Sequence, residues 1–288
     1  MNGKCDVLVL GVTGMLGSTV LKYFFSRNKY EVFGTMRGSK TPTALENLKK
    51  SIICEIDAEH TDEIAKVLDI YKPSIVINCV GVVKQLAESN DPLICMPINS
   101  LLPHKLNRLC KLRNVRLIHI STDCVFDGER GMYLESDWPN ARDLYGRTKL
   151  LGEVVSNNSI TLRTSIIGHE IGSSQSLLEW FLRQTGDSVN GYSKAIFSGL
   201  PTVELARVIH DYVICEPSLN GLYHVSSDPI NKYELLKLIA KEYSKEIEIS
   251  KEDSIIIDRS LDSSKFREAT NFQPSSWKEM VAKMKEFG

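Results

Sequence analysis

A short apolar segment that runs directly into a glycine-rich turn constrains the fold of this 288-residue chain more than any other feature. The segment Asp6-Val7-Leu8-Val9-Leu10 is typical of a parallel strand that is buried on both faces. The turn Gly11-Val12-Thr13-Gly14-Met15-Leu16-Gly17 follows at once, and a helical pattern of apolar residues continues through residues 20–25. Strand, glycine turn and helix in this order predict a dinucleotide-binding unit.

The three glycines have separate roles in such a unit. Gly11 permits the tight turn, Gly14 lets the backbone approach a pyrophosphate, and Gly17 lets the helix pack closely on the strand. The free N–H groups at the helix N-terminus attract phosphate. A glycine-rich turn without a ligand is the alternative. We predict cofactor contacts along the whole turn, from Gly11, Thr13, Gly14, Met15, Leu16 and Gly17.

The end of the second predicted strand indicates which dinucleotide is preferred. This strand covers Glu31 to Arg37. Sites that prefer NAD carry an acidic residue here, which bonds the ribose 2′-hydroxyl. The guanidinium of Arg37 instead suits a 2′-phosphate by charge and shape. We therefore predict NADP(H) as the cofactor, with NAD(H) as the alternative; a solvated surface arginine is the other interpretation of Arg37.

Three residues farther along the chain predict carbonyl chemistry. Tyr145 and Lys149 are four residues apart and share one face if the segment is helical. The lysine ammonium is expected to lower the phenol pKa, so that Tyr145 can transfer a proton to a carbonyl oxygen. Thr122 ends an apolar strand and can orient that oxygen with its hydroxyl. The set predicts an enzyme that reduces a carbonyl or oxidises an alcohol with a nicotinamide cofactor.

Composition excludes several other classes of protein. The net charge of −1 offers no electrostatic basis for binding nucleic acid or an anionic membrane. The chain has no run of about 18 apolar residues and no signal-peptide pattern, so we expect a cytoplasmic protein without a membrane segment. The seven cysteines form no C-x-x-C pair and the six histidines show no ligand spacing. We therefore expect reduced, buried thiols and no metal site.

Four motifs together resemble one family, the dTDP-4-dehydrorhamnose reductases, which belong to the extended short-chain dehydrogenases. They are Gly11-x-x-Gly14-x-x-Gly17, Ser121 to Gly128, Tyr145 to Glu153, and Leu162 to Ser165. The resemblance covers most of the chain and is strongest over residues 5–168. It implies an α/β fold, with a Rossmann-type doubly wound parallel sheet over residues 1–165. A small C-terminal α/β substrate lobe is expected over residues 166–288, with some segments shared between the two parts.

The resemblance also implies further cofactor-binding residues. It places Asp57 and Ala58 near the adenine ring, at the end of a third strand. It places Cys79, Val80 and Gly81 beside the cofactor ribose, where the chain leaves another strand. Tyr145 and Lys149 are expected to contact the cofactor as well as to act in catalysis.

Substrate is expected in a cleft between the two parts. The predicted substrate-binding residues are Lys84, Thr122, Asp123, Cys124, Tyr145 and Arg163, and Lys194 is a further candidate cation. Cys124 stands where the family has an aromatic residue, and Val82-Val83-Lys84-Gln85 departs from the family's small residues. Because both departures lie on the expected substrate side, the identity of the nucleotide and of the sugar stays open.

These expectations favour an NADPH-dependent reductase of a nucleoside-diphosphate 4-keto-6-deoxy sugar in polysaccharide precursor synthesis, with a homodimer as a candidate assembly. An epimerase on the same scaffold is the first alternative, although it would hold NAD, which suits Arg37 poorly. A non-catalytic NADP-binding subunit, like the regulatory subunit of methionine adenosyltransferase, is the second. A dehydratase is disfavoured because Thr122 is followed by Asp123-Cys124 rather than by an Asp-Glu pair.

Overall fold

The computed structural model describes residues 5–84 and 87–288. Gln85, in the segment that departs from the family pattern, lies outside the described residues. A sheet of seven parallel strands forms the centre of the described chain, in the order β3-β2-β1-β4-β5-β6-β11. The prediction of a doubly wound parallel sheet is confirmed. The strands are β1 (Val7–Leu10), β2 (Val32–Thr35), β3 (Ile52–Ile53), β4 (Ile75–Asn78), β5 (Arg116–Thr122), β6 (Ser159–Thr164) and β11 (Gly221–His224).

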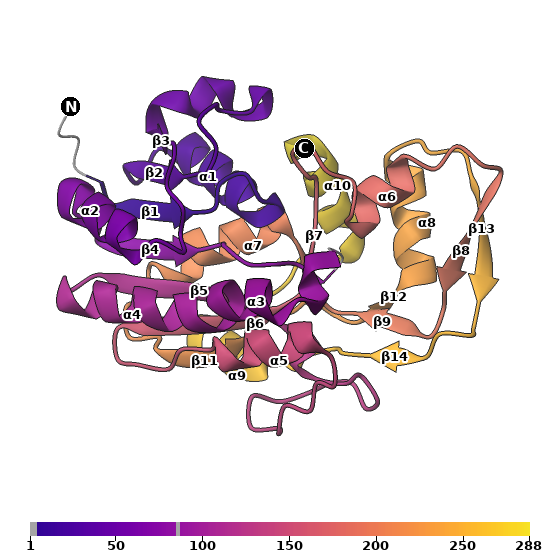
Figure 1. The fold of residues 1–288 in the computed structure, drawn as a ribbon. Coiled ribbons are helices and arrows are strands. Elements are labelled where there is room, and N and C mark those ends of the chain that lie inside the picture. Colours follow the sequence, from indigo (N-terminus) through magenta and orange to yellow (C-terminus); the bar gives the residue numbers. More distant parts are fainter. Residues whose placement is uncertain (1–4, 85–86) are drawn as a thin grey trace.

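The apolar run of β1 is explained by helices on both faces of the sheet (Figure 1). Val7 and Val9 pack into a core with α1 and α7, whereas Leu8 and Leu10 pack into a second core with α2 and α4. Successive strand residues point to opposite faces, so a strand covered on both sides is apolar throughout. The helical segments of this part are α1 (Met15–Arg27), η1 (Thr43–Ser51), α2 (Thr61–Tyr71), η2 (Ala87–Asn90), α3 (Pro92–Cys95), η3 (Met96–Leu101), α4 (Leu102–Leu112), η4 (Asp123–Val125), α5 (Leu144–Leu151), α7 (Thr202–Val208) and η5 (Ile209–Val213).

A smaller α/β unit lies beside the carboxyl ends of the sheet strands (Figure 1). Its strands form two small sheets, β13-β8 and β12-β9-β14, and α6, α8 and α10 share a core with them. The remaining elements are β7 (Ile166–Ile167), α6 (Leu177–Leu182), β8 (Ser188–Tyr192), β9 (Ala195–Phe197), β10 (Leu200–Pro201), β12 (Ile230–Asn231), α8 (Lys232–Glu242), β13 (Glu248–Glu252), β14 (Ile257–Asp258), α9 (Ser264–Thr270) and α10 (Trp277–Phe287).

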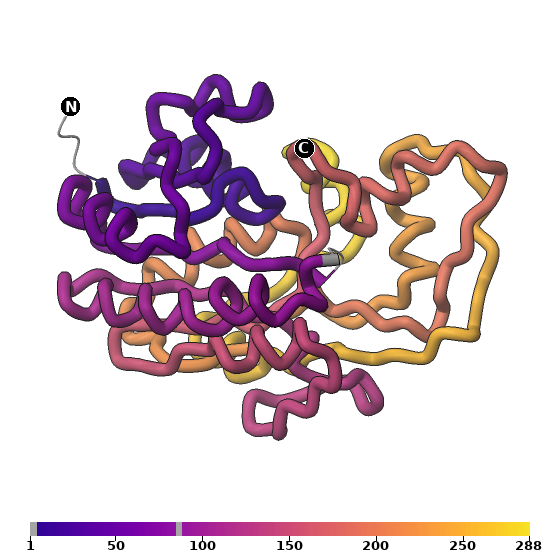
Figure 2. Tube along the Cα trace, in the orientation of Figure 1, coloured from indigo at the N-terminus to yellow at the C-terminus, as the bar shows by residue number. Residues whose placement is uncertain are grey.

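Segments after residue 165 contribute to both parts. Strand β11 pairs with β6 at the edge of the large sheet, and α7 packs in the same core as α1. Figure 2 shows orange and yellow chain, from the C-terminal half, running through both parts of the molecule. The small unit is therefore held to the sheet by several passes of the chain.

Candidate active site

The glycine turn between β1 and α1 has the geometry that a dinucleotide requires. Gly11 has a φ of +83°, and a Cβ atom on Gly17 would lie 2.2 Å from the carbonyl oxygen of Gly11. Helix α1 starts after Gly14 with no side-chain cap and no acidic residue in its first turn. Its first N–H groups therefore remain available to a phosphate. The side chain of Leu16 is buried in the core, so this residue can offer only its backbone.

The predicted adenosine end lies where β2 and β3 finish next to one another. Arg37 follows β2 and is exposed, and its guanidinium has no carboxylate partner among the described residues. Asp57 follows β3 and is half-buried beside Ala58. The backbone N–H of Asp57 donates to Glu63 at 2.8 Å, and its carboxylate accepts from the N–H of Glu59 at 3.0 Å. Asp57 is therefore already engaged with its own neighbours in the chain, whereas the exposed Arg37 is available to a 2′-phosphate.

The chain leaving β4 links the glycine turn to the catalytic lysine. A Cβ atom on Gly11 would lie 3.0 Å from Val80 Cγ2. One on Gly81 would lie 3.9 Å from Lys149 Nζ. Burial raises the pKa of the Cys79 thiol to about 12, against the opposing charge of Lys149, so the thiol stays neutral. The residues predicted to lie beside the cofactor ribose, Cys79, Val80 and Gly81, therefore lie between the glycine turn and the helix that carries Lys149.

Helix α5 carries Tyr145 and Lys149 and lies very close to the end of β5. Asp143 caps this helix by accepting from the N–H of Gly146 at 2.7 Å. A Cβ atom on Gly146 would lie 2.2 Å from the carbonyl oxygen of Cys124, so only glycine allows this approach. The approach brings the Tyr145 phenol within reach of the Thr122 hydroxyl, which influences its proton affinity. The predicted catalytic residues Thr122, Tyr145 and Lys149 are thus assembled at one place.

The electrostatics differ from the sequence expectation at Tyr145. Burial raises the pKa of the phenol well above its usual value, the neighbouring Cys124 adds to this, and the Thr122 hydroxyl only partly opposes it. Lys149 donates to the carbonyl of Ile120 at 2.7 Å. The expectation that Lys149 gives Tyr145 a lowered pKa is therefore wrong for the chain alone. The phenol remains protonated at neutral pH and is suited to donate its proton.

Lys149 is itself affected by burial. Removal from water lowers the pKa of its ammonium to about 8, while Glu153 and Cys79 act in the opposite direction. The lysine therefore keeps most of its charge at neutral pH and loses it in mildly alkaline solution. A cation at this position would stabilise the negative charge that develops on a carbonyl oxygen when its carbon receives a hydride, or on a phenol when it gives up its proton.

The structure contradicts the prediction that Arg163 binds substrate, because the side chain is buried away from the substrate side. Its Nε and Nη2 atoms donate to the two carboxylate oxygens of Glu153 at 2.7 and 2.8 Å. The side chain is only 3% exposed, and Nη1 lies 3.2 Å from the His224 ring. Ser121 also donates to Glu153 at 2.7 Å. The buried pair joins β5, β6 and the end of α5, and it has no surface left for a substrate.

Lys84 and Asp123 lie on the predicted substrate side, and the charge of Lys84 is already compensated by a carboxylate. Lys84 donates to Asp143 at 2.6 Å, and both side chains are partly exposed. The Asp123 carboxylate accepts from the Thr122 hydroxyl at 3.1 Å. Burial raises the pKa of Asp123, against the attraction of Arg259. The thiol of Cys124 lies in the same group of residues, and burial raises its pKa to about 12.

Asn99, which the family resemblance places in a helix that shapes the site, binds the chain that leaves β4. Its amide oxygen accepts from the N–H of Val82 at 2.9 Å and its amide nitrogen donates to the Val82 carbonyl at 3.2 Å. Asn99 lies in η3, a π-helical turn, and is 1% exposed. Such turns often accompany functional sites. Asn99 therefore holds the backbone that follows Gly81 against η3.

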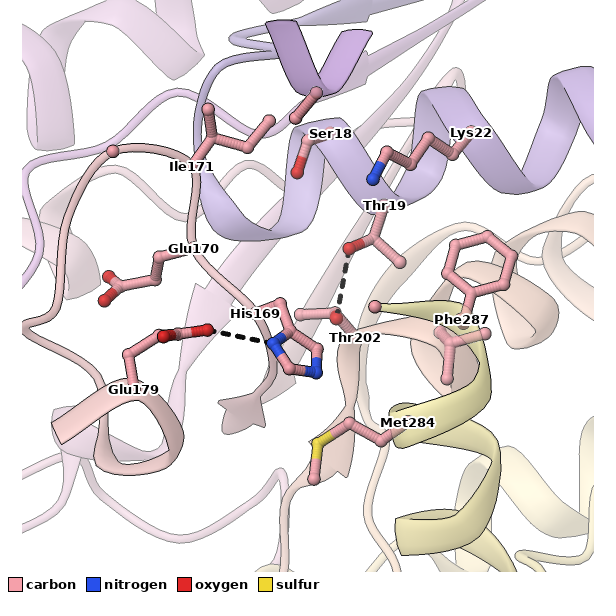
Figure 3. A pocket seen from close by; sticks show the side chains of 14 residues that line it. Ser18, Thr19, Lys22, His169, Glu170, Ile171, Glu179, Thr202, Met284 and Phe287 are labelled. Atoms are coloured by element: carbon pink, nitrogen blue, oxygen red, sulfur yellow. Dashed lines mark hydrogen bonds and ion pairs between the residues drawn. The ribbon is translucent and has the colours of Figure 1, made fainter. Parts of the chain in front are cut away.

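A separate cavity of about 290 Å³ lies beside α1 (Figure 3). Lys22 and Thr19 of α1 line one side, and His169 and Glu179 line the other. His169 bonds Glu179 and the Tyr243 hydroxyl, both at 2.9 Å. The described residues that line this cavity include none of the predicted site residues, so it is distinct from the catalytic centre.

Within residues 5–84 and 87–288, no group of three or more His, Cys, Asp and Glu side chains is placed to hold a metal ion. Likewise, no described helix combines the length and the apolar character that crossing a membrane requires.

The doubly wound sheet, the glycine turn and the Thr122, Tyr145 and Lys149 set define an extended short-chain dehydrogenase/reductase, a class of oxidoreductase. The family model for the RmlD substrate binding domain matches residues 5–286, and the chain belongs to this family. The resemblance to the dTDP-4-dehydrorhamnose reductases is confirmed.

Three known proteins illustrate the range of relatives. The chain is 28% identical to a probable low-salt glycan biosynthesis reductase, Agl14, of Haloferax volcanii, over 76% of this chain and 73% of that one. It is also 28% identical to the methionine adenosyltransferase 2 subunit beta of Bos taurus, over 83% and 72% of the two chains. The solved dTDP-4-dehydrorhamnose reductase of Bacillus anthracis, in complex with NADP, superposes with a TM-score of 0.81 at 20% identity and covers 99% of both chains.

Proposed function

We propose that the protein is an NADPH-dependent reductase of a nucleoside-diphosphate 4-keto-6-deoxy sugar, acting in polysaccharide or glycan precursor synthesis. The observation that carries the proposal is the close approach of α5 to the end of β5, which assembles Thr122, Tyr145 and Lys149. The names of the reductase relatives support the substrate class. Residues 1–165 would then bind the cofactor and residues 166–288 would contribute the substrate side.

The chemistry follows from the positions of the side chains. A bound nicotinamide supplies the hydride. Tyr145, which stays protonated because it is buried, donates its proton to the carbonyl oxygen. Thr122 orients that oxygen, and the Lys149 charge stabilises the negative charge that develops on it or on the phenolate. We assign Thr122 and Tyr145 to substrate contact as well, and Tyr145 and Lys149 to cofactor contact.

The cofactor preference rests on Arg37. Its exposed guanidinium follows β2, and no described carboxylate neutralises it, so a 2′-phosphate would find a free cation there. A solved relative in complex with NADP supports this preference. NAD(H) is the alternative cofactor, and solved relatives of lower identity are in complex with NAD or NAD+.

A non-catalytic role is the second candidate function, favoured by one observation. Several relatives are the beta subunit of methionine adenosyltransferase 2, and they match over most of this chain. The protein would then bind a dinucleotide and a partner without turnover. The assembled Thr122, Tyr145 and Lys149 argue for catalysis, because a binding subunit has no need of that constellation.

The decisive experiment follows the loss of NADPH absorbance with dTDP-, UDP- and GDP-linked 4-keto-6-deoxy sugars. Consumption with one of them establishes a reductase and identifies the substrate, and a parallel series with NADH gives the cofactor preference. Cofactor binding without consumption across the panel would contradict the reductase proposal and favour the binding role. Light scattering on the same sample would test the homodimer that we propose as its assembly.

A further inference from the structure

A buried asparagine and a buried histidine lie side by side in the central sheet, near the edge where the cofactor is expected. Asn78 is the last residue of β4, and His119 is its register partner in β5. Their side chains are 1% and 0% exposed. Val76 and Leu117, two residues earlier in each strand, pack into the core with α2 and α4, so the pair projects to the same face. Two polar side chains are therefore enclosed beside an apolar core.

The hydrogen bonds of this pair fix the orientation of both polar groups. The amide oxygen of Asn78 accepts from the backbone N–H of Val80 at 3.2 Å, so the amide nitrogen faces His119 and lies 3.1 Å from Nδ1. Because an amide nitrogen can only donate, Nδ1 accepts and the ring proton is on Nε2. Burial and the charge of Lys149 lower the pKa of His119 well below its usual value, so the ring stays neutral. The hydrogen bonds therefore form a chain from Val80 through Asn78 to His119.

Val80 depends on this chain of bonds because it has already left the sheet. The N–H of Cys79 still donates to the carbonyl of Leu10 in β1, at 3.2 Å. The next N–H, that of Val80, has no carbonyl partner among the described residues and donates only to Asn78. The first part of the turn after β4 is therefore held by a side chain and not by the sheet.

This turn connects the two parts of the cofactor site. A Cβ atom on Gly11 would lie 3.0 Å from Val80 Cγ2, so the Val80 side chain packs against the glycine turn. A Cβ atom on Gly81 would lie 3.9 Å from Lys149 Nζ, and Asn99 holds the backbone that follows. A displacement of Val80 would therefore disturb the surface that lies between the glycine turn and the catalytic lysine.

Fold stability alone does not account for a histidine at this position. Nε2 of His119 is buried and has no hydrogen-bond partner in the part of the chain that the structure describes. A buried donor without a partner is destabilising. An aliphatic side chain would avoid that cost, but it could not accept a hydrogen bond from Asn78. The group that histidine adds here is the acceptor Nδ1.

We propose that His119 is a positioning residue for the cofactor: through Asn78 it holds the N–H of Val80, and with it the turn after β4, in the conformation that receives the dinucleotide. The inference assigns His119 no contact with substrate and no step of hydride or proton transfer. It requires a nicotinamide dinucleotide and no particular sugar, so it does not rest on the proposed function and applies equally to a reductase and to a binding subunit.

The test is titration of NADPH and of NADH into the full-length protein, followed by cofactor fluorescence and without substrate. His119→Leu removes the acceptor and should weaken the binding of both cofactors about fivefold, because the hydrogen bond that fixes the turn is lost. His119→Asn is the matched control. Asparagine has nearly the shape of leucine and leaves the same space behind, but its amide oxygen can accept from Asn78, so most of the affinity should return. Both cofactors should lose affinity by the same factor, because the turn lies on the ribose side and not at the 2′-phosphate.

Three outcomes would overturn the inference. The first is a Kd of His119→Leu equal to that of the wild type. The second is an equal loss of affinity in His119→Leu and His119→Asn, since the space left by the ring, and not the acceptor, would then be responsible. The third is a wild type that binds neither cofactor. Should His119→Leu fail to fold, His119→Phe fills the space of the ring without an acceptor, and the same loss of affinity is expected.

Discussion

Replacing Arg163 by methionine should destabilise the fold while leaving the substrate KM of the folded enzyme nearly unchanged. The guanidinium bonds both oxygens of Glu153 at 2.7 and 2.8 Å, and the two side chains are 3% and 8% exposed. Without it, the Glu153 carboxylate keeps one described side-chain donor, the Ser121 hydroxyl. An unpaired charge then remains in an environment of low dielectric constant.

The expected magnitude follows from burial. Breaking a buried ion pair by removing one partner costs about 3–5 kcal/mol in free energy of unfolding. Domains of about 150–250 residues lose about 2–4 °C in Tm for each kcal/mol. The Tm of Arg163→Met should therefore fall by at least about 6 °C. The double variant with Glu153→Leu should recover much of this loss, since no unpaired charge remains.

Thermal unfolding of wild type, Arg163→Met and the double variant checks the prediction, together with steady-state kinetics well below each Tm. A Tm within about 1 °C of the wild type, combined with a KM raised about tenfold, would refute the reasoning. That result would place Arg163 on the substrate side, as the sequence predicts.

The remaining predictions concern the cofactor and the catalytic residues. Tyr145→Phe should abolish turnover and leave the Kd for cofactor intact; residual turnover close to wild type would remove Tyr145 from the acid role. Arg37→Asp should move the preference from NADPH towards NADH, measured as the ratio of kcat/KM values, and a wild type that already prefers NADH would contradict it. Gly17→Ala should weaken cofactor binding at least about tenfold, because its Cβ would lie 2.2 Å from a backbone oxygen; Gly186→Ala, with nothing within 4 Å, is the control and should bind normally. Reductase kcat/KM should fall as pH rises through about 8, where Lys149 loses its charge. The unfolded chain binds this proton up to about 10.5, so the same lysine should make stability rise between pH 8 and 10.5, a slope that Lys149→Met abolishes in denaturation experiments.

The cofactor half of the fold could be predicted from local patterns. The run before Gly11 is apolar at every position because both faces of β1 are covered by helices. Gly17 is required by a contact with Gly11 only six residues away. Such features depend on neighbours in the chain, which a sequence displays directly. The same holds for Tyr145 and Lys149, whose spacing places them on one helix.

For the C-terminal half, the sequence predicts the elements but not where they pack. The apolar residues of α7 and β11 predict a helix and a strand, yet the pattern does not tell which of two cores they enter. The structure places both with the large sheet, because β11 adds to the edge beside β6 and α7 packs on α1. Local propensity predicts whether a segment forms a helix or a strand. The element against which that segment packs depends on the arrangement of the whole chain.

By itself, the sequence determined the parallel sheet and the glycine turn and predicted three catalytic residues, because each of these depends on local patterns in the chain. Only the tertiary structure decided which charges are free to act. Arg163 is buried in an ion pair with Glu153 and therefore has no surface left for a substrate, although its position after Leu162 suggests one. Burial and ion pairing are properties of the packed chain, and they set both the proton affinity of Tyr145 and the charge that a substrate would meet.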